Sequence, residues 1–391
     1  MSTFVVRGGV VFDGTEWRGV QDIVLRDGIV VEEEPSTRQA HEQIDAAGCW
    51  VIPALTDGHC HLLPSHLLRL PFFGVGFAVD MFSTGDMRPG MDQEAAAGGA
   101  RYVTSDVGAS VRGGHPYQLV ESGLYRDFPS LEESGGPAAF VRDRVAAGAS
   151  LIKVFVDDGR AAGQCLPTLQ PSDVALLVAE AHARRLPVVA HAPTVDLALA
   201  ALEAGVDGLA HVPIPYEDAE SDDVVAALAA RRAFVISTVV AIAAALGVPL
   251  VGSLPRSRLW ERISTRWRRH LGLAGRAVPE EATLRRVLKL LASAHEAGIP
   301  VYPGTDAAFP GVMPGASLHV ELEVLRDCGF SDHELLVAAT SGLRRRMGWR
   351  LGGAHPEGRA ELLVLEEDPR ESITATRSMR TVILGEKVLR F

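Results

Sequence analysis

The feature that most constrains the fold is an alternation of apolar, strand-like runs with amphipathic, helix-like runs from about residue 150 onward. LIKVFV (151–156) precedes VALLVAEAHARR (174–185), and PVVAH (187–191) precedes VDLALAALEAG (195–205). Alternation of this kind predicts βα units around a parallel sheet. Five such strands fit between Lys153 and Asp306, and three more fit between residues 50 and 110. We therefore expect an α/β fold built on a TIM-type (β/α)8 barrel.

The two ends of the chain have a different pattern. The first fifty residues contain short apolar runs divided by Gly-Gly and Asp-Gly pairs, and the last thirty contain similar runs in ELLVL and TVILGEKVLRF. Such pairs between apolar runs are typical of β-hairpins. We predict one small composite β-sandwich domain from residues 1–52 and 355–391, and a barrel domain from residues 53–354.

Histidines and one aspartate recur where the predicted strands end. His59 and His61 are two residues apart in one strand, so their side chains share a face. His191, His211 and Asp306 each end a later strand. The active sites of barrels lie at these carboxyl ends. A lone histidine there is usually a core residue, but four histidines and an aspartate at equivalent positions predict a metal site.

Lys153 lies inside the apolar run LIKVFV, although only three of the 38 basic residues are lysines. Burying an ammonium group is costly unless it has a partner. One reading is an edge lysine whose amine reaches solvent. The functional reading, which we favour, is that burial lowers the pKa of Lys153, that the neutral amine takes up carbon dioxide, and that the carbamate bridges two metal ions.

In this order, the segments VIPALTDGHCH, SLIKVFVDDG, VVAHA, GLAHV and GTDA resemble the amidohydrolase superfamily of TIM-barrel, metal-dependent hydrolases. The sequence is most similar to the imidazolonepropionase-like and prolidase-like branch, over nearly the whole chain. The resemblance implies two divalent ions, with zinc as the expected metal. One ion would be held by His59, His61 and Asp306 and the other by His191 and His211, with carboxylated Lys153 between them.

Several positions depart from the pattern of that superfamily. Ala54 replaces a glycine in the first strand, Glu361 replaces the aspartate of ADL, and Pro314 replaces the histidine of an HG pair. Ser237 and Val239 also differ from the usual PTL of strand seven. None of these residues belongs to the predicted ligand set. Hydrolysis therefore stays the expected activity.

The expected reaction is hydrolysis of an amide C–N bond in a small molecule such as a dipeptide, an N-acyl amino acid or a cyclic amide. A hydroxide bridging the two ions would attack the carbonyl. Asp306 would take its proton and pass it to the leaving nitrogen. Asp57 shares the face of His59 and is a candidate to orient a ligand imidazole, although a solvated or capping aspartate is an equal alternative.

The segment VRGGHPYQL after the third strand supplies the candidate substrate contacts. His115, also a candidate catalytic residue, and Tyr117 would hold the scissile carbonyl or another polar group, and Arg112 would receive a carboxylate. A glycine turn with incidental polar residues is the alternative.

Three other functions stay open at this stage. A single-metal enzyme of the same fold would open a cyclic amide or deaminate its substrate. A lactone or ester hydrolase would use the same nucleophile. A non-catalytic scaffold is the third, although scaffold relatives lose ligands and all six positions are filled here.

The net charge of −11 argues against a nucleic-acid partner. The uncharged stretch 233–252 is long enough to cross a membrane, but Gly247 and Pro249 interrupt it, so no membrane span is expected. Four cysteines without a C-x-x-C pair, and the lack of an evident signal peptide, favour the cytoplasm. A homo-oligomer is expected. Leu259, Ile263 and Trp267 predict an amphipathic helix within residues 253–276, either over the site or on the outer surface.

Overall fold

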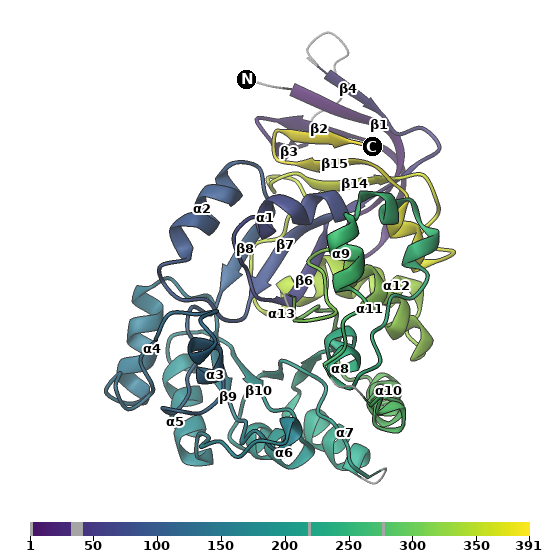
Figure 1. Ribbon diagram of the computed structural model, residues 1–391. Coiled ribbons are helices and arrows are strands. Elements are labelled where there is room, and N and C mark those ends of the chain that lie inside the picture. The colour runs from purple at the N-terminus through teal and green to yellow at the C-terminus, as the bar shows by residue number, and fades with distance from the viewer. Residues whose placement is uncertain (1–2, 33–41, 218–219, 276–277, 308) are drawn as a thin grey trace.

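Two parallel sheets lie at the centre of the larger part of the molecule (Figure 1). The computed structural model describes residues 3–32, 42–217, 220–275, 278–307 and 309–391. One sheet has the order β6–β7–β8 and the other β13–β12–β11–β10–β9. From β6 to β13 the strands span Leu55–Cys60, Val75–Asp80, Arg101–Thr104, Ile152–Phe155, Val188–His191, Gly208–Leu209, Phe234–Ile236 and Val301–Tyr302.

Backbone bridges join the two sheets at both of their edges. Beyond β8, Ala109 pairs in parallel with Val154 of β9, and Cys60 of β6 pairs in parallel with Ala307, beyond β13. The strands therefore follow one another in chain order, and the last is connected back to the first. This is the order that a barrel of eight parallel strands requires.

Helices connect these strands, as the alternation in the sequence predicted. The longest of them, α10, buries Leu284, Val287 and Leu291 on one face and exposes charged side chains on the other. The helices are α1 (His66–Arg69), α2 (Arg88–Ala96), α3 (Tyr117–Glu121), α4 (Pro137–Ala146), α5 (Pro171–His182), α6 (Val195–Glu203), α7 (Glu220–Arg231), α8 (Val239–Ala245), α9 (Thr265–His270), α10 (Glu281–Glu296), α11 (Ala316–Asp327), α12 (Asp332–Val337) and α13 (Leu343–Arg346). The mixed α/β fold is confirmed.

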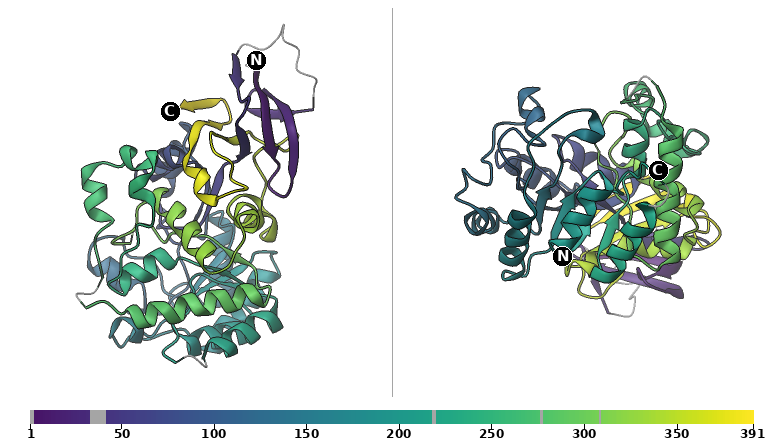
Figure 2. Two further views of the ribbon diagram at one scale, coloured as in Figure 1. Left: turned by 90° about the vertical axis from the view of Figure 1, so that its right-hand side faces the viewer. Right: turned by 90° about the horizontal axis from the view of Figure 1, so that it is seen from below.

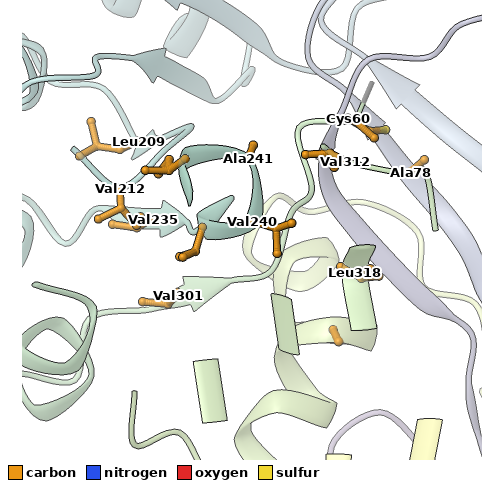
Figure 3. Packing of buried hydrophobic residues seen from close by; sticks show 14 of the residues in the cluster. Cys60, Ala78, Leu209, Val212, Val235, Val240, Ala241, Val301, Val312 and Leu318 are labelled. Atoms are coloured by element: carbon orange, nitrogen blue, oxygen red, sulfur yellow. The ribbon is translucent and has the colours of Figure 1, made fainter. Parts of the chain in front are cut away.

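The main hydrophobic core lies between the strands and the surrounding helices. Figure 3 shows Leu209 of β11, Val235 of β12 and Val301 of β13 close to Val240 of α8. Strands that are buried on both faces read as continuous apolar runs rather than as alternating ones. This packing leaves the strand ends as the places where polar side chains can reach a cavity.

The two chain ends form a separate sheet at one end of the molecule, where both termini lie (Figure 2). Its order is β16–β15–β14–β5–β1–β2–β3, and β4 pairs with β1. A second hydrophobic cluster, which includes Val11, Leu25, Val51 and Leu362, belongs to this sheet. The predicted boundaries between the two domains, after residue 52 and before residue 355, stay a prediction. The strands are Thr3–Phe12, Trp17–Arg26, Ile29–Val31, Glu42–Asp45 and Trp50–Pro53 for β1 to β5, and Glu361–Leu365, Met379–Leu384 and Lys387–Arg390 for β14 to β16.

The uncharged stretch 233–252 contains the buried strand β12 and the seven-residue helix α8. Across the described ranges, no helix has the length and apolar character that a membrane crossing requires.

The prediction of one amphipathic helix within residues 253–276 is wrong. The segment contains two short 3₁₀ helices, Leu254–Arg256 and Arg258–Arg262, and then α9. Ile263 is extended, with φ −90° and ψ 119°, and Ser264 starts α9 by accepting a hydrogen bond from the Trp267 amide. Leu259 and Ile263 are buried, so the apolar pattern reflects docking onto the core rather than one continuous helix.

Candidate metal centre

The six predicted ligands line one cavity of about 590 Å³. Lys153 lies within the short strand β9, and the other five lie at or just beyond the carboxyl ends of their strands, which the parallel order brings to one side. They are His59, His61, Lys153, His191, His211 and Asp306.

His59 and His61 both aim a ring nitrogen at Asp306. The Nε2 atoms of His59 and His61 lie 3.3 and 3.1 Å from Oδ1 of Asp306. Nδ1 of His59 donates to the carbonyl of Ala210 at 2.9 Å, and Nδ1 of His61 donates to that of Phe82 at 3.3 Å. Because a carbonyl can only accept, each neutral ring presents an unshared electron pair at Nε2. Three acceptor atoms that face one another need a cation or a proton between them.

The charges of these residues favour a cation. Burial, and then the neighbouring Lys153, lowers the pKa of His59 to about 3, so its imidazole is neutral near pH 7. Burial by itself would raise the pKa of Asp306, but the contacts with His59 and His61 hold it well below its usual value. Nε2 of His59 is buried and has no hydrogen-bond partner among the described residues. A neutral imidazole and an ionised carboxylate are the forms that bind divalent metals.

Two more histidines complete the cluster. His191 is the last residue of β10, and His211 lies just beyond β11. The ring of His211 lies 4.7 Å from that of His59 and 4.8 Å from that of His191, measured between centroids. Nδ1 of His211 is hydrogen-bonded to Oγ1 of Thr238 at 2.8 Å. A ligand atom of His59, one of His211 and one of Asp306 lie within 4.8 Å of one another. A metal ion fits this donor set.

A buried carboxylate holds the loop that contains Thr238. Glu321 of α11 accepts hydrogen bonds from the amides of Val239 and Val240, at 2.8 and 2.9 Å, where α8 begins. Thr238 precedes that helix with φ +48°, in the left-handed region that threonine rarely adopts. Glu321 therefore helps to place the hydroxyl that contacts His211.

Lys153 is buried, with an exposed fraction of 1%, and its side chain lines the same cavity. In the described parts of the chain, its amine makes no hydrogen bond and no ion pair. Burial lowers the pKa of Lys153 to about 7, and the charge of Asp306 opposes this shift. The alternative that Lys153 is a lysine at the edge of the sheet, with its amine in solvent, is therefore wrong. A substantial neutral amine fraction near pH 7 is what uptake of carbon dioxide requires.

Asp157 is a member of the site that the sequence analysis missed. Nε2 of His191 donates to Oδ2 of Asp157 at 3.1 Å, which leaves Nδ1 of that ring free to bind a metal. His115 stacks on His191 with centroids 4.6 Å apart and an angle of 7° between the rings. Lys153, Phe155 and Asp157 are spaced two apart and line one cavity, so strand periodicity could have identified Asp157.

Asp57 does not contact a ligand imidazole, and its predicted role is corrected. It is fully buried and accepts hydrogen bonds from the amides of His59 and Thr305, at 3.2 and 3.0 Å. A Cβ on Gly304 would lie 2.8 Å from the amide nitrogen of His59, so only glycine permits this close approach. Asp57 therefore connects β6, by hydrogen bonds, to the segment that carries Asp306.

The predicted substrate contacts are only partly placed at the cavity. His115 lines it, but Tyr117 and Arg112 do not. The hydroxyl of Tyr117 donates to the carbonyl of Phe128 at 3.1 Å. Arg112 forms ion pairs with Asp127, at 2.6 Å, and with Glu133. These two side chains are thus engaged outside the cavity, and their contacts with a substrate stay predictions.

Comparison with known proteins gives a fold but no assigned activity. No family model matches the chain. An uncharacterized protein of Mycobacterium tuberculosis is 24% identical over 354 residues, which cover 86% of this chain and 84% of that protein.

Solved structures of hydrolases are similar over the full length. The crystal structure of a Xaa-Pro dipeptidase with bound methionine has a TM-score of 0.75, with 18% identity and all of both chains covered. Phenylurea hydrolase B has a TM-score of 0.73, with 17% identity over 99% of this chain and 97% of that chain. At such identities the likeness shows the fold. Solved structures described as a prolidase and as an amidohydrolase share this fold as well.

Proposed function

We propose that the chain is a metal-dependent amidohydrolase that cleaves an amide-type C–N bond of a small molecule, with two divalent ions, expected to be zinc. We further propose that the two parallel sheets form one closed (β/α)8 barrel of TIM type. The bridges from Ala109 to Val154 and from Cys60 to Ala307 support this closure. The solved hydrolases of this fold support the general class of reaction.

One observation carries the proposal: a ring nitrogen of His59, one of His61 and a carboxylate oxygen of Asp306 face one another beside a buried lysine. Nε2 of His59 lies buried at 3.3 Å from Oδ1 of Asp306 without a hydrogen bond to any described residue, and a bound cation would satisfy both atoms. His59, His61 and Asp306 would hold one ion. His191 and His211 would hold the other, and a carboxylated Lys153 would bind both.

When bound, the ions would supply a water molecule of lowered pKa and would polarise the carbonyl of the substrate. Asp306 accepts the proton of the attacking water at a carboxylate oxygen and donates it to the leaving nitrogen. Asp157 fixes the ring of His191, and Thr238 fixes that of His211. Burial, and then His191, keep His115 neutral by lowering its pKa to about 3, and this ring, which lines the cavity, would contact the scissile carbonyl.

The experiment is a screen of dipeptides, N-acyl amino acids, N-acyl amines and cyclic amides with the zinc-loaded protein, followed by liquid chromatography of the products. Hydrolysis of at least one class, lost in the Lys153→Ala variant, would support the proposal. Full activity of that variant would contradict the two-ion arrangement. The exposed lysine on α10 provides a matched control, Lys289→Ala, which should retain full activity.

A further inference from the structure

The cavity next to the metal centre is mainly apolar. Beyond the six ligands, Asp157 and His115, the polar side chains among its described lining are Gln118, Gln164 and the Tyr125 hydroxyl. The volume of about 590 Å³ lies within the ~300–1,000 Å³ range of sites for drug-sized ligands. The cavity is therefore suited to a small molecule that is held mainly by apolar contacts.

Two apolar walls face each other across the centre. Leu119 and Leu124, in and after α3, form one wall, and Ile242 and Leu246, in and after α8, form the other. The first segment follows β8 and the second follows β12. These are the third and seventh of the eight parallel strands, and they lie opposite each other in a ring of eight. In the view of Figure 1, β9 and β10 are drawn between α3 and α8. A bond held at the metal centre would thus have an apolar wall on each side.

The charges of the lining disfavour an acidic substrate. Lys153 is the one lysine or arginine lining the cavity within the described ranges, and we assign it to the metal centre. The carboxylates of Asp157 and Asp306 add negative charge. The nearby Arg112 is occupied by Asp127 and Glu133. A substrate carboxylate would lose its hydration here without gaining a cationic partner among the described side chains, which is costly.

We propose that the cavity selects neutral amides with an apolar group on both the acyl and the amine side, and rejects analogues that carry a carboxylate. This inference rests on the proposed function, because the metal centre fixes where the scissile bond lies. It narrows the substrate class to N-acyl amines, anilides and related neutral compounds. Dipeptides and N-acyl amino acids become poor substrates.

The test compares N-benzoyl-2-phenylethylamine with N-benzoyl-L-phenylalanine, which differ only by the carboxylate. We expect kcat/KM for the neutral compound to be at least about tenfold higher in the zinc-loaded protein. N-acetyl-2-phenylethylamine, which lacks the acyl-side ring, should be a poorer substrate than the benzoyl compound. An equal or higher kcat/KM for the acid, or no loss for the acetyl compound, would overturn the inference.

Binding to the metal-free Lys153→Met variant, in which no lysine amine lines the cavity, separates this inference from the proposed function. Titration calorimetry should show tighter binding of the neutral benzoyl compound than of the acid. If that preference holds and neither compound is hydrolysed by the zinc-loaded protein, the proposed function fails and the inference stands. Tighter binding of the acid would overturn the inference even if both compounds are hydrolysed.

An added cation gives a second check. Leu124 is 51% exposed, so the Leu124→Arg variant should fold while it places a positive charge at the cavity. We expect the preference for the neutral over the acidic compound to fall by at least about threefold. Leu176→Arg on α5, a position that is 55% exposed and outside the cavity, is the matched control and should keep the wild-type preference. An unchanged preference in Leu124→Arg would contradict the inference.

Discussion

Oδ2 of Asp157 lies 3.1 Å from Nε2 of His191, so a carboxylate fixes one ring nitrogen of a predicted metal ligand and leaves the other free. A carboxylate behind a ligand imidazole sets the tautomer and the orientation of the ring. Burial would raise the pKa of Asp157, but the hydrogen bond from His191 is foremost among the effects that bring it to about 2, so it is ionised near pH 7.

The Asp157→Asn variant should bind metal more weakly, because the amide keeps the shape but not the charge that holds His191. We expect a loss of about 10- to 100-fold in affinity for one of the two ions, measured by competition with a chromophoric chelator. Asp158→Asn is the neighbouring control, since Asp158 pairs with Arg160 instead. Equal affinity in Asp157→Asn and wild type would refute this role.

The Lys153→Met variant should remove a pH dependence of stability from the metal-free protein. Burial lowers the pKa of Lys153 from 10.5 to about 7. Between these values the unfolded chain binds a proton that the folded chain does not, so the free energy of unfolding rises with pH across this window. Below about pH 7 the folded protein carries the full cost of the buried charge.

Urea denaturation at several pH values, in buffer depleted of metal and carbon dioxide, measures this effect. Lys153→Met should be more stable than wild type near pH 7, and the difference should shrink toward pH 10.5. Lys289→Met, at an exposed position of α10, is the control and should follow the wild-type profile. A constant difference between Lys153→Met and wild type at all pH values would show that the lysine does not titrate in this window.

The Glu361→Gln variant should destabilise the fold where the terminal sheet meets the parallel strands. Glu361 of β14 pairs with Arg344 of α13 at 2.7 Å and also with Arg101, and the side chains of Glu361 and Arg344 are only 1% and 2% exposed. Removing one partner of a buried pair leaves an unpaired charge and costs about 3–5 kcal/mol. Chemical denaturation measures the loss.

Two further variants check that the loss comes from the unpaired charge. Arg344→Met combined with Glu361→Leu should recover much of the stability, because neither charge is then buried alone. Glu366→Gln breaks the exposed pair with Arg258 and should cost less than about 1 kcal/mol. If the double variant were less stable than Glu361→Gln, burial of an unpaired charge would not be the cause.

The sequence predicted the features that depend on local periodicity. Alternating runs indicated the βα units, and residues at equivalent strand ends indicated the cavity that receives His59, Lys153 and His211. Asp157 obeys the same period of two as Lys153, although β9 itself ends at Phe155.

The features that the sequence could not show depend on contacts between residues that are distant in sequence. The local pattern could not show that Arg112 pairs with Asp127 and Glu133, up to 21 residues away. It also could not show that Ile263 takes an extended conformation and interrupts the predicted helix. The sequence showed only that Glu361 departs from a motif of the superfamily. The fold shows that this glutamate pairs with two arginines, Arg101 and Arg344.

Anomalous X-ray diffraction from crystals of the zinc-loaded protein tests the central claim most directly. The account predicts two zinc peaks per chain, one bounded by His59, His61 and Asp306 and the other by His191 and His211. Density for a carboxyl group on the amine of Lys153 should connect them. A single peak, or two peaks with an unmodified Lys153 that contacts neither, would contradict the two-ion centre.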